Sequence, residues 1–487
     1  MEALKEIPLY ITFDDILILP NYSEILPSEV NLETRLTRNI KLNIPIISAA
    51  MDTVTENEMA IEISKAGGIG IIHRNLTSDE QAKEVEKVKK YHSWIITNPL
   101  YVEENTTVGE ALKIMRQQNI SGLPVVKNGF LVGIVTSRDL RFENDTGKKV
   151  KEVMTPKEKL IVLKEGNVSQ EEAKRKMHQY KIEKLPVVDD EFRLKGLITL
   201  KDIRKDEENP MALKDSQGRL IVGAAVGVGE KEIERVEKLI EAGVDVIVVD
   251  SAHGHSKGVI DMVKKIKEKF DIDVIGGNVA TADGARAMVE AGADAIKVGV
   301  GAGSICTTRI VTGVGVPQVS AVMECYSVAK KYSIPIISDG GIRYPGDIAK
   351  ALSVGADSVM LGNMLAGTDE APGEKVIRDG RPYKIYRGMG SEDAIKEGVL
   401  KGVRSRYLGG NDILPEGVVG AVPYKGSVRY IISNIVKAIK ASFGYVGAKD
   451  INEFKKKAKI IKITEAGYKE SHVHDIQIIK DTSTTIY

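Results

Sequence analysis

Eight short apolar runs rich in β-branched residues alternate with amphipathic helical patterns along most of this chain. The runs occupy residues 45–49, 68–73, 220–225, 244–250, 273–278, 293–299, 334–340 and 356–362. Such alternation predicts an α/β fold with a parallel sheet. A helix-to-strand motif also recurs as Glu-Ala-Gly-Val-Asp at 241–245, Glu-Ala-Gly-Ala-Asp at 290–294 and Ser-Val-Gly-Ala-Asp at 353–357. This repetition favours a (β/α)₈ TIM barrel, with a doubly wound sheet as the alternative.

Residues suited to chemistry stand at or just beyond the carboxyl ends of these runs, namely Asp250, Asn278, Cys306, Asp339 and Gly362. In a parallel barrel these ends meet at one face, and that face carries the active site. We therefore expect these residues to converge on one cavity.

The glycine-rich loop Gly-Val-Gly-Ala-Gly-Ser-Ile-Cys-Thr-Thr-Arg at residues 299–309 carries the most chemistry. Glycines let the backbone adopt positive φ and approach a ligand closely. A free thiol titrates near ~8.5, and a nearby positive charge or helix N-terminus makes its thiolate available. Cys306 is therefore a candidate nucleophile. The alternative is a small buried cysteine in a glycine-rich turn.

Composition limits the partners and the compartment. The 487-residue chain has a formal net charge of +1, so we expect no dedicated nucleic-acid site and no binding to anionic membranes. Two cysteines, Cys306 and Cys325, cannot form a disulfide framework and suit a reducing cytoplasm. The first residues lack the features of a signal peptide, and no apolar run approaches the ~20 residues of a membrane span. We therefore expect a cytoplasmic protein.

An interruption at residues 93–205 contains a repeat of its own. Residues 121–126 and 133–140 return as residues 183–188 and 196–203, and a helical pattern precedes each copy, at 108–118 and 170–180. Each β-α-β-like copy would leave an apolar face to bury, so the copies should pack on each other.

This repeat resembles a tandem pair of CBS domains. Its doubled Thr-x-x-Asp pattern, Thr136 with Asp139 and Thr199 with Asp202, fits their nucleotide-contacting motif. The resemblance implies that Asp139 and Asp202 contact a regulatory purine nucleotide. The alternative is an inserted module that packs or oligomerises without binding a ligand.

Further motifs extend the resemblance to almost the whole chain. They are Phe-Asp-Asp-Ile-Leu-Ile-Leu-Pro at 13–20, Ser-Ala-Ala-Met-Asp-Thr-Val-Thr-Glu at 48–56, Asp-Ser-Ala-His-Gly at 250–254, Gly-Gly-Asn-Val at 276–279, the loop at 299–309, Asp-Gly-Gly-Ile at 339–342, Tyr-Arg-Gly-Met-Gly-Ser at 386–391 and Glu-Gly-Val-Val-Gly-Ala-Val at 416–422. With the CBS-like pair, they resemble the inosine-5′-monophosphate (IMP) dehydrogenases. The resemblance implies a catalytic barrel in two parts, residues 1–92 and 206–487, around a regulatory module at 93–205. It also implies a mobile flap at about 380–425 and a C-terminal cation-site segment.

The implied reaction is the NAD-dependent oxidation of IMP to xanthosine 5′-monophosphate, the committed step of guanine nucleotide synthesis. A nucleophile must add to C2 of the purine so that this carbon becomes sp³ and can release hydride, and Cys306 suits that role. The resulting thioimidate on Cys306 is then hydrolysed. The resemblance assigns the base for hydrolysis to Arg406 and Tyr407 and adds Thr308 to the catalytic set. A phosphate contact or a surface ion pair is the alternative for Arg406.

The resemblance also implies binding residues. Those for the substrate are Met51, Asn278, Ser304, Asp339, Gly341, Gly362, Asn363, Tyr386, Met389, Gly390 and Glu416, and those for NAD are Asp250, Ser251 and Gly299. Backbone N–H groups of Ser304, Gly341, Gly362 and Asn363 should cradle the phosphate. Asn363 stands where the family more often has serine. Asp250 and Asn278 could instead cap turns at strand ends.

A monovalent cation, usually K⁺, is also implied. Its ligands would be carbonyls of Gly301, Gly303 and Cys306 and of Glu465, Ala466 and Gly467 from a neighbouring subunit. Family members form homotetramers that can pair into octamers. His472 and His474 invite a zinc reading, but two histidines without a third partner make a weak site.

Two other functions compete with the dehydrogenase. A guanosine monophosphate (GMP) reductase would share the barrel and the cysteine loop, but normally lacks the CBS insertion and the Arg-Tyr flap. A catalytically silent nucleotide-sensing protein is the other rival. The joint presence of Cys306, Asp339 and Arg406 argues against a silent barrel.

Overall fold

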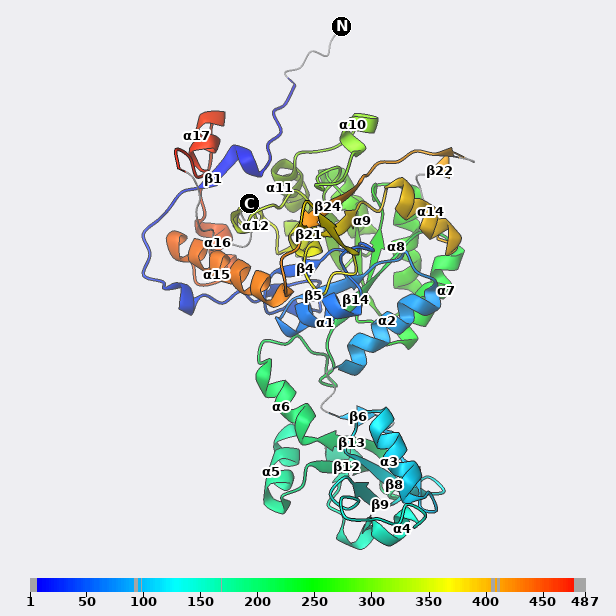
Figure 1. Cartoon of the computed structure of the whole chain (residues 1–487). Helices are drawn as coiled ribbons and strands as arrows, with labels where there is room; N and C mark the ends of the chain where they lie inside the picture. Colours follow the sequence, from blue (N-terminus) through cyan, green and yellow to red (C-terminus); the bar gives the residue numbers. More distant parts are fainter. Residues whose placement is uncertain are drawn as a thin grey trace. The chain divides into compact units, whose positions relative to one another are not determined.

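A computed structural model describes residues 7–91, 95–97, 99–167, 169–403, 408–409 and 412–476. The chain forms two compact units (Figure 1). The barrel unit comprises Met1–Tyr91, Met211–Asp215 and Leu220–Tyr487, and the repeat unit comprises His92–Pro210 and Ser216–Arg219.

Eight parallel strands of the barrel unit close into a barrel in the order β14-β15-β16-β17-β18-β19-β4-β5. They are β4 (Ile46–Ser48), β5 (Ile69–Ile72), β14 (Val222–Val226), β15 (Val246–Asp250), β16 (Asp273–Val279), β17 (Ala295–Val298), β18 (Ile336–Asp339) and β19 (Ser358–Leu361). Each strand overlaps one predicted apolar run. The (β/α)₈ prediction is therefore confirmed, and the doubly wound alternative is wrong.

One long helix follows each strand and packs outside the barrel (Figure 1). The helices are α1 (Asn57–Lys65), α2 (Ser78–Tyr91), α7 (Glu230–Glu241), α8 (Lys257–Lys269), α9 (Ala282–Glu290), α11 (Gln318–Ala329), α12 (Pro345–Ser353) and α15 (Val428–Val446). Helix α15 contacts both α1 and α12 and so completes the ring. The sequence predicts an amphipathic helix at 427–442, and α15 confirms it.

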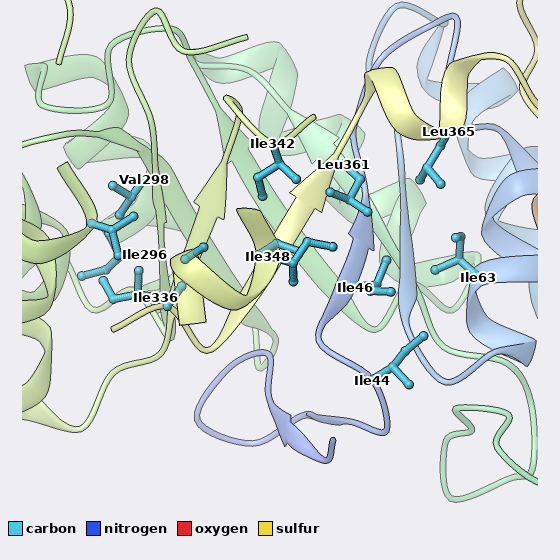
Figure 2. Packing of buried hydrophobic residues seen from close by; sticks show 14 of the residues in the cluster. Ile44, Ile46, Ile63, Ile296, Val298, Ile336, Ile342, Ile348, Leu361 and Leu365 are labelled. Carbon is cyan, nitrogen blue, oxygen red and sulfur yellow. The ribbon is translucent and has the colours of Figure 1, made fainter. Parts of the chain in front are cut away.

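Strand side chains alternate between two buried layers. Ile47, Val248 and Ile337 belong to the cluster inside the barrel. Their neighbours face outward, where Ile46 and Ile336 join the layer beneath the helices (Figure 2). Strands buried on both faces are expected to be almost continuously apolar, which explains why the runs stand out in the sequence.

The recurring helix-to-strand motif forms the same set of contacts three times at the amino ends of the strands: an aspartate accepts a backbone N–H and pairs with a lysine. Its aspartates are Asp245, Asp294 and Asp357, and each accepts a backbone N–H at the start of the preceding strand, from Val222, Val274 and Ile336 at 2.8–2.9 Å. A lysine contacts each carboxylate at 2.8 Å, namely Lys89, Lys267 and Lys455. The glycine before each strand has positive φ, which ends the helix and starts the turn. The repeated motif therefore stabilises the end of the barrel opposite the expected active site.

The connection between β19 and α15 is long and has structure of its own. It contains α13 (Asn363–Ala366), β20 (Lys375–Arg378), β21 (Arg381–Arg387), α14 (Glu392–Leu400), β22 (Leu408–Gly409), β23 (Asp412–Ile413) and β24 (Val419–Pro423). Strands β20, β21 and β24 form an antiparallel sheet. Arg406 and Tyr407, the predicted base pair, lie outside the described residues.

The two ends of the barrel unit meet. Strand β1 (Ile16–Ile18), which follows the short helix η1 (Phe13–Asp15), pairs with β25 (Ile460–Lys462). Helix α17 (Glu465–Glu470), in the polar tail, contacts η1. At the amino end of the barrel, the hairpin of β2 (Thr34–Arg35) and β3 (Lys41–Leu42) adds Leu36 and Leu42 to the interior cluster.

The repeat unit contains two four-stranded sheets, ordered β10-β9-β8-β7 and β11-β12-β13-β6. Its elements are β6 (Ile96–Thr97), β7 (Val102–Glu103), α3 (Val108–Gln117), β8 (Gly122–Lys127), β9 (Phe130–Thr136), α4 (Val150–Val153), β10 (Thr155–Pro156), β11 (Leu163–Lys164), α5 (Gln170–Tyr180), β12 (Lys184–Val188), β13 (Leu194–Thr199) and α6 (Leu200–Glu208). Each copy has the order β-α-β-β, one strand more than expected, and β6 joins the second copy's sheet although it precedes the first copy. The copies touch, since Lys184 Nζ donates to Ser121 Oγ at 2.7 Å. Across the described residues, no helix is long and apolar enough to cross a membrane.

Candidate active site

A cavity of about 410 Å³ opens at the carboxyl end of the barrel. Its described lining contains fifteen of the predicted site residues, namely Met51, Asp250, Ser251, Asn278, Gly303, Ser304, Cys306, Asp339, Gly341, Gly362, Asn363, Tyr386, Met389, Gly390 and Glu416. The expectation that strand-end residues converge on one cavity is therefore correct.

Three charged side chains occupy the floor of this cavity because of strand register. Asp250, Lys297 and Asp339 each stand two residues beyond an inward-facing apolar residue, which are Val248, Ala295 and Ile337. Lys297 Nζ lies 2.8 Å from Asp250 Oδ1 and 2.6 Å from Asp339 Oδ2. Burial by itself would lower the pKa of Lys297, but the two carboxylates raise it above its usual value. The ammonium also outweighs the effect of burial on Asp250 and lowers the pKa of that carboxyl.

Asn278 completes this charged floor. Its Nδ2 donates to Gly299 O at 2.8 Å and to Asp339 Oδ2 at 2.9 Å, while its Oδ1 accepts from Lys297 Nζ. The amide therefore ties the cysteine loop to the strand-end carboxylate. Asn278 and Asp250 therefore belong to one shared network centred on Lys297.

The thiol of Cys306 is partly exposed at the cavity, and its surroundings suit a reactive cysteine. Its Sγ lies 3.1 Å from Thr308 Oγ1, and that hydroxyl donates to Glu416 Oε2 at 2.8 Å. Cys325 is fully buried instead, and burial raises the pKa of its thiol. The buried-core reading therefore fits Cys325 and not Cys306.

Thr308 has only one hydroxyl hydrogen, which fixes the direction of the chain of contacts. Because this hydrogen points to Glu416, the thiol must donate to Thr308 Oγ1. A proton can thus pass from Cys306 through Thr308 to the carboxylate of Glu416. The arrangement gives protons a path between the thiol and a carboxylate in either direction.

Backbone pairing brings Glu416 to the cysteine loop across more than a hundred residues. Thr307 N donates to Glu416 O at 2.9 Å, and Val418 N donates to Ile305 O at 3.1 Å. Glu416 N in turn donates to Gly390 O at 2.9 Å. Residues 416–418 of the flap region, residues 380–425, are therefore attached to the loop that carries the thiol, and Gly390 is attached to Glu416.

The remaining end of the cavity is rich in backbone donors. Gly341 adopts a φ of +79°, and Gly362 precedes the helical turn that begins at Asn363. A Cβ atom on Gly362 would lie 2.8 Å from Tyr386 Oη, so only glycine leaves this space free. Burial raises the pKa of Tyr386 to about 12, which keeps its phenol protonated as a donor. Neutral donors of this kind, with Ser304 beside them, can hold an anion.

An ion-pair network fixes the base of the flap region to the barrel. Arg387 Nη2 lies 2.6 Å from Asp52 Oδ2 and 2.5 Å from Glu397 Oε2. Asn75 Nδ2 donates to Asp52 Oδ2 at 2.8 Å. Hydrogen bonds from Arg387 and Lys401 lower the pKa of Glu397 to about 2. The network holds Met389 and Gly390, which follow Arg387 closely, at the cavity.

Some predicted residues lie elsewhere. Gly299, Gly301, Thr308 and residues 465–467 do not appear among the described residues lining the cavity. Glu465, Ala466 and Gly467 belong to α17, against η1. Among described residues there is also no cluster of three or more His, Cys, Asp or Glu side chains arranged for a metal ion.

The repeat unit has a separate cavity of about 890 Å³ between its two copies. Its lining includes the basic residues Lys184, Lys201 and Arg204, the acidic residues Glu183 and Glu208, and Thr199 of the predicted motif. Asp139 is absent from its described lining, and its Oδ2 instead accepts from Thr136 N at 2.8 Å and from Thr136 Oγ1 at 2.7 Å. The side chain of Asp202 lies outside the described residues.

Sequence reasoning missed Lys297 and the Asp52–Arg387–Glu397 network. Lys297 could have been found, because a lysine within the apolar run 293–299 must face inward or outward into a buried layer. The network could not, because Asp52 lies 335 residues before its partner Arg387 in the chain.

Comparison with known proteins agrees with this geometry. A family model described as IMP dehydrogenase / GMP reductase domain matches residues 10–474. The inosine-5′-monophosphate dehydrogenase of Aquifex aeolicus is 57% identical, over 99% of this chain and 98% of that protein. The enzyme of the same name from Bacillus subtilis is 50% identical, over 97% of each.

A solved structure of a GMP reductase from Trypanosoma brucei, in complex with guanosine 5′-monophosphate, is also similar. It is 42% identical with a TM-score of 0.90 and covers 98% of this chain and 100% of that one. By its motifs, its closed barrel and these relatives, the chain belongs to the IMP dehydrogenase / GMP reductase family.

Proposed function

We propose that this protein catalyses the NAD-dependent oxidation of IMP to xanthosine 5′-monophosphate. The observation that carries the proposal is the Cys306–Thr308–Glu416 chain at the cavity, beside the strand-end carboxylate of Asp339. The reaction needs a nucleophile for C2 of the purine, and Cys306 is the partly exposed thiol of the two cysteines. Relatives named inosine-5′-monophosphate dehydrogenase, at up to 57% identity over nearly the full length, support the same activity.

The chemistry follows from the positions of these groups. Thr308 passes the thiol proton to Glu416, and the thiolate sulfur bonds to C2 of the purine. NAD⁺ supplies the acceptor for the hydride that C2 then releases, which leaves a thioimidate on Cys306. Water adds to C2, the C2–S bond breaks, and the sulfur leaves as thiolate. The sum is IMP, NAD⁺ and water giving xanthosine 5′-monophosphate, NADH and a proton.

The substrate would extend from the backbone donors to the cysteine. Its phosphate would meet the N–H groups of Ser304, Gly341, Gly362 and Asn363, and its ribose hydroxyls would donate to Asp339. The structure fits this placement because the space beside Gly362 is kept free of a side chain. Met51, Met389 and Gly390 line the same cavity and would contact the base.

Asp250 and Ser251 would hold the nicotinamide riboside of NAD. Asp250 suits this role because only its Oδ1 pairs with Lys297. Its Oδ2 accepts no hydrogen bond from described residues, and the residue lines the cavity. Gly299 lies beside this position, where its carbonyl accepts from Asn278.

Hydrolysis requires a base for water. We assign it to Arg406 and Tyr407, whose motif supports the role, with the Thr308–Glu416 pair adjacent to the thioimidate. K⁺ would be held by carbonyls of Gly301, Gly303 and Cys306 and of residues 465–467 of a second subunit. Gly301 has a φ of +71°, a turn of the kind that exposes carbonyl oxygens.

The domain at 93–205 would be a CBS module that binds a purine nucleotide. Its cavity with Lys184, Lys201 and Arg204 supports this, since basic side chains attract phosphates. Asp202 remains the assigned ribose contact, and Asp139 would have to release Thr136 to act. We assign a homotetramer, and exposed apolar side chains near the cysteine loop, such as Ile310 and Val314, would suit an interface between subunits.

The test is the absorbance of NADH on mixing purified protein, IMP and NAD⁺, with and without K⁺. We expect a K⁺-dependent rise, and Cys306→Ala should abolish it while IMP binding persists. Arg406→Ala should give a burst of NADH followed by slow turnover. A normal rate in Cys306→Ala would show that Cys306 is not the nucleophile. Absence of the NADH burst in Arg406→Ala would show that Arg406 does not act in hydrolysis.

A GMP reductase is the second candidate, and a specific observation favours keeping it. The reductase from Trypanosoma brucei aligns with 98% of this chain, so an insertion at 93–205 does not distinguish the two activities as expected. Consumption of NADPH with GMP and release of ammonia would identify the reductase. Absence of activity in both assays would instead indicate a nucleotide-sensing protein without catalytic activity.

A further inference from the structure

The most deeply buried charge at the active site belongs to a residue with no role in the proposed chemistry. Lys297 is 3% exposed, in a strand that is otherwise apolar. Its ammonium has three hydrogens and three acceptors, which are Asp250 Oδ1 at 2.8 Å, Asp339 Oδ2 at 2.6 Å and Asn278 Oδ1. Every donor of the ammonium is therefore used within the protein.

The geometry makes the two carboxylates interdependent. Asp250 Oδ1 and Asp339 Oδ2 both contact Lys297 Nζ, at 2.8 Å and 2.6 Å, so these two oxygens are no farther apart than the sum of the two distances. Without a cation between them, two carboxylates at this separation repel each other, and one of them takes up a proton. The opposite oxygens, Asp250 Oδ2 and Asp339 Oδ1, accept no hydrogen bond from described residues, and both side chains are partly exposed in the lining of the cavity.

We propose that Lys297 is a positioning residue that serves the substrate and cofactor sites together. It offsets the repulsion between Asp339 and Asp250 and holds both carboxylates in place, one for the ribose of the purine nucleotide and the other for the riboside of NAD. It also orients the Asn278 amide between them. The inference rests on the proposed function for the identity of the two ligands, while the shared counter-ion is a feature of the structure.

Other charged or titratable groups near the cluster must be included in a pH experiment. Among the described residues they are Arg74, whose charge reaches Asp250, Tyr386, on which the charge of Asp339 acts, and Cys306, Glu416, Asp14 and Arg343 in the same cavity. All of these groups remain in a Lys297 variant. The ratio of its Kd to that of the unaltered protein at each pH therefore cancels their contribution to the pH dependence of binding.

The test measures binding of IMP by calorimetry from pH 6 to pH 8.5, with full-length protein and no turnover. We expect Lys297→Met to weaken binding at least roughly 30-fold at pH 8. The ratio of its Kd to that of the unaltered protein should fall as the pH is lowered, because protonation of one carboxylate relieves the repulsion. Lys297→Arg should stay within about tenfold. Lys267→Met is the matched control, since it removes a lysine–aspartate pair at the other end of the barrel and should leave binding unchanged.

A double variant separates repulsion from packing. Asp250→Asn together with Lys297→Met removes one negative charge as well as the cation, so it should bind IMP more tightly than Lys297→Met alone. A Kd ratio that is constant with pH, or a double variant no better than the single one, would overturn the proposal. Lys297→Gln replaces Lys297→Met if the latter does not fold. Failure of the unaltered protein to oxidise bound IMP would instead count against the proposed function.

Discussion

Replacement of Thr308 by valine tests the proton path with little change of shape. The hydroxyl lies between Cys306 Sγ at 3.1 Å and Glu416 Oε2 at 2.8 Å, and valine puts a methyl group there. A hydrogen bond to a charged group contributes about 1.5–3 kcal/mol. At 1.36 kcal/mol per factor of ten, its loss from the reacting state lowers the rate by roughly 10- to 150-fold. We expect kcat/KM for IMP to fall about 100-fold, within the range of general acid–base contributions.

The assay is NADH formation at saturating NAD⁺, together with the Kd of IMP. Thr308→Ser is the matched control because it keeps the hydroxyl, and it should lose less than about fivefold. Glu416→Gln should resemble Thr308→Val, since an amide cannot take the proton. The deficit of Thr308→Val should narrow as the pH rises, because hydroxide in the solvent replaces the path. Equal rates for the valine and serine variants would refute the reasoning.

Three further variants probe the rest of the barrel unit. Asp294→Ala leaves the buried N–H of Val274 without its acceptor. We therefore expect the free energy of unfolding in urea to fall by about 2–3 kcal/mol while kcat is retained. An unchanged free energy of unfolding would show that this aspartate does not stabilise the end of the barrel. Gly362→Ala should raise the KM for IMP more than tenfold, because its Cβ would lie 2.8 Å from Tyr386 Oη, and a normal KM would show that the phosphate binds elsewhere. The pKa of Glu397 is about 2 in the folded protein, against 4.5 when it is unfolded. Ionised Glu397 therefore adds about 1 kcal/mol to the free energy of unfolding, after allowance for its solvent exposure. This stabilisation is fully present above pH 4.5 and is lost as the pH falls toward 2. Glu397→Gln should therefore melt lower than the unaltered protein at pH 6, and the difference should shrink as the pH falls toward 2.

The cysteine loop illustrates how far local sequence reaches. Its glycines and Cys306 are contiguous, so the turn and the candidate nucleophile can be recognised together. The partner that completes the site, Glu416, lies 108 residues beyond Thr308 in the chain. Only the pairing of residues 305–307 with 416–418 brings the two segments into contact.

Lys297 shows the complementary limit. Period-two alternation places it on one of two buried faces, but alternation cannot say which charges stand on neighbouring strands. That depends on the closure of the barrel, where β17 lies between β16 and β18 and beyond β16 lies β15. The burial of Lys297 between Asp250 and Asp339 is a consequence of that order and of the strand register.

The sequence by itself determined the eight strands, the helix that follows each of them, the repeated insertion and most of the residues around the cavity. These follow from periodicity and from motifs, which are local properties of the chain. Only the tertiary structure decided that the sheet closes, which hydroxyl links the thiol to a carboxylate, and how one ammonium serves two aspartates. Hydrogen bonds and ion pairs act over about 3 Å, and that proximity between distant segments is created by packing and strand order rather than by neighbours in the sequence.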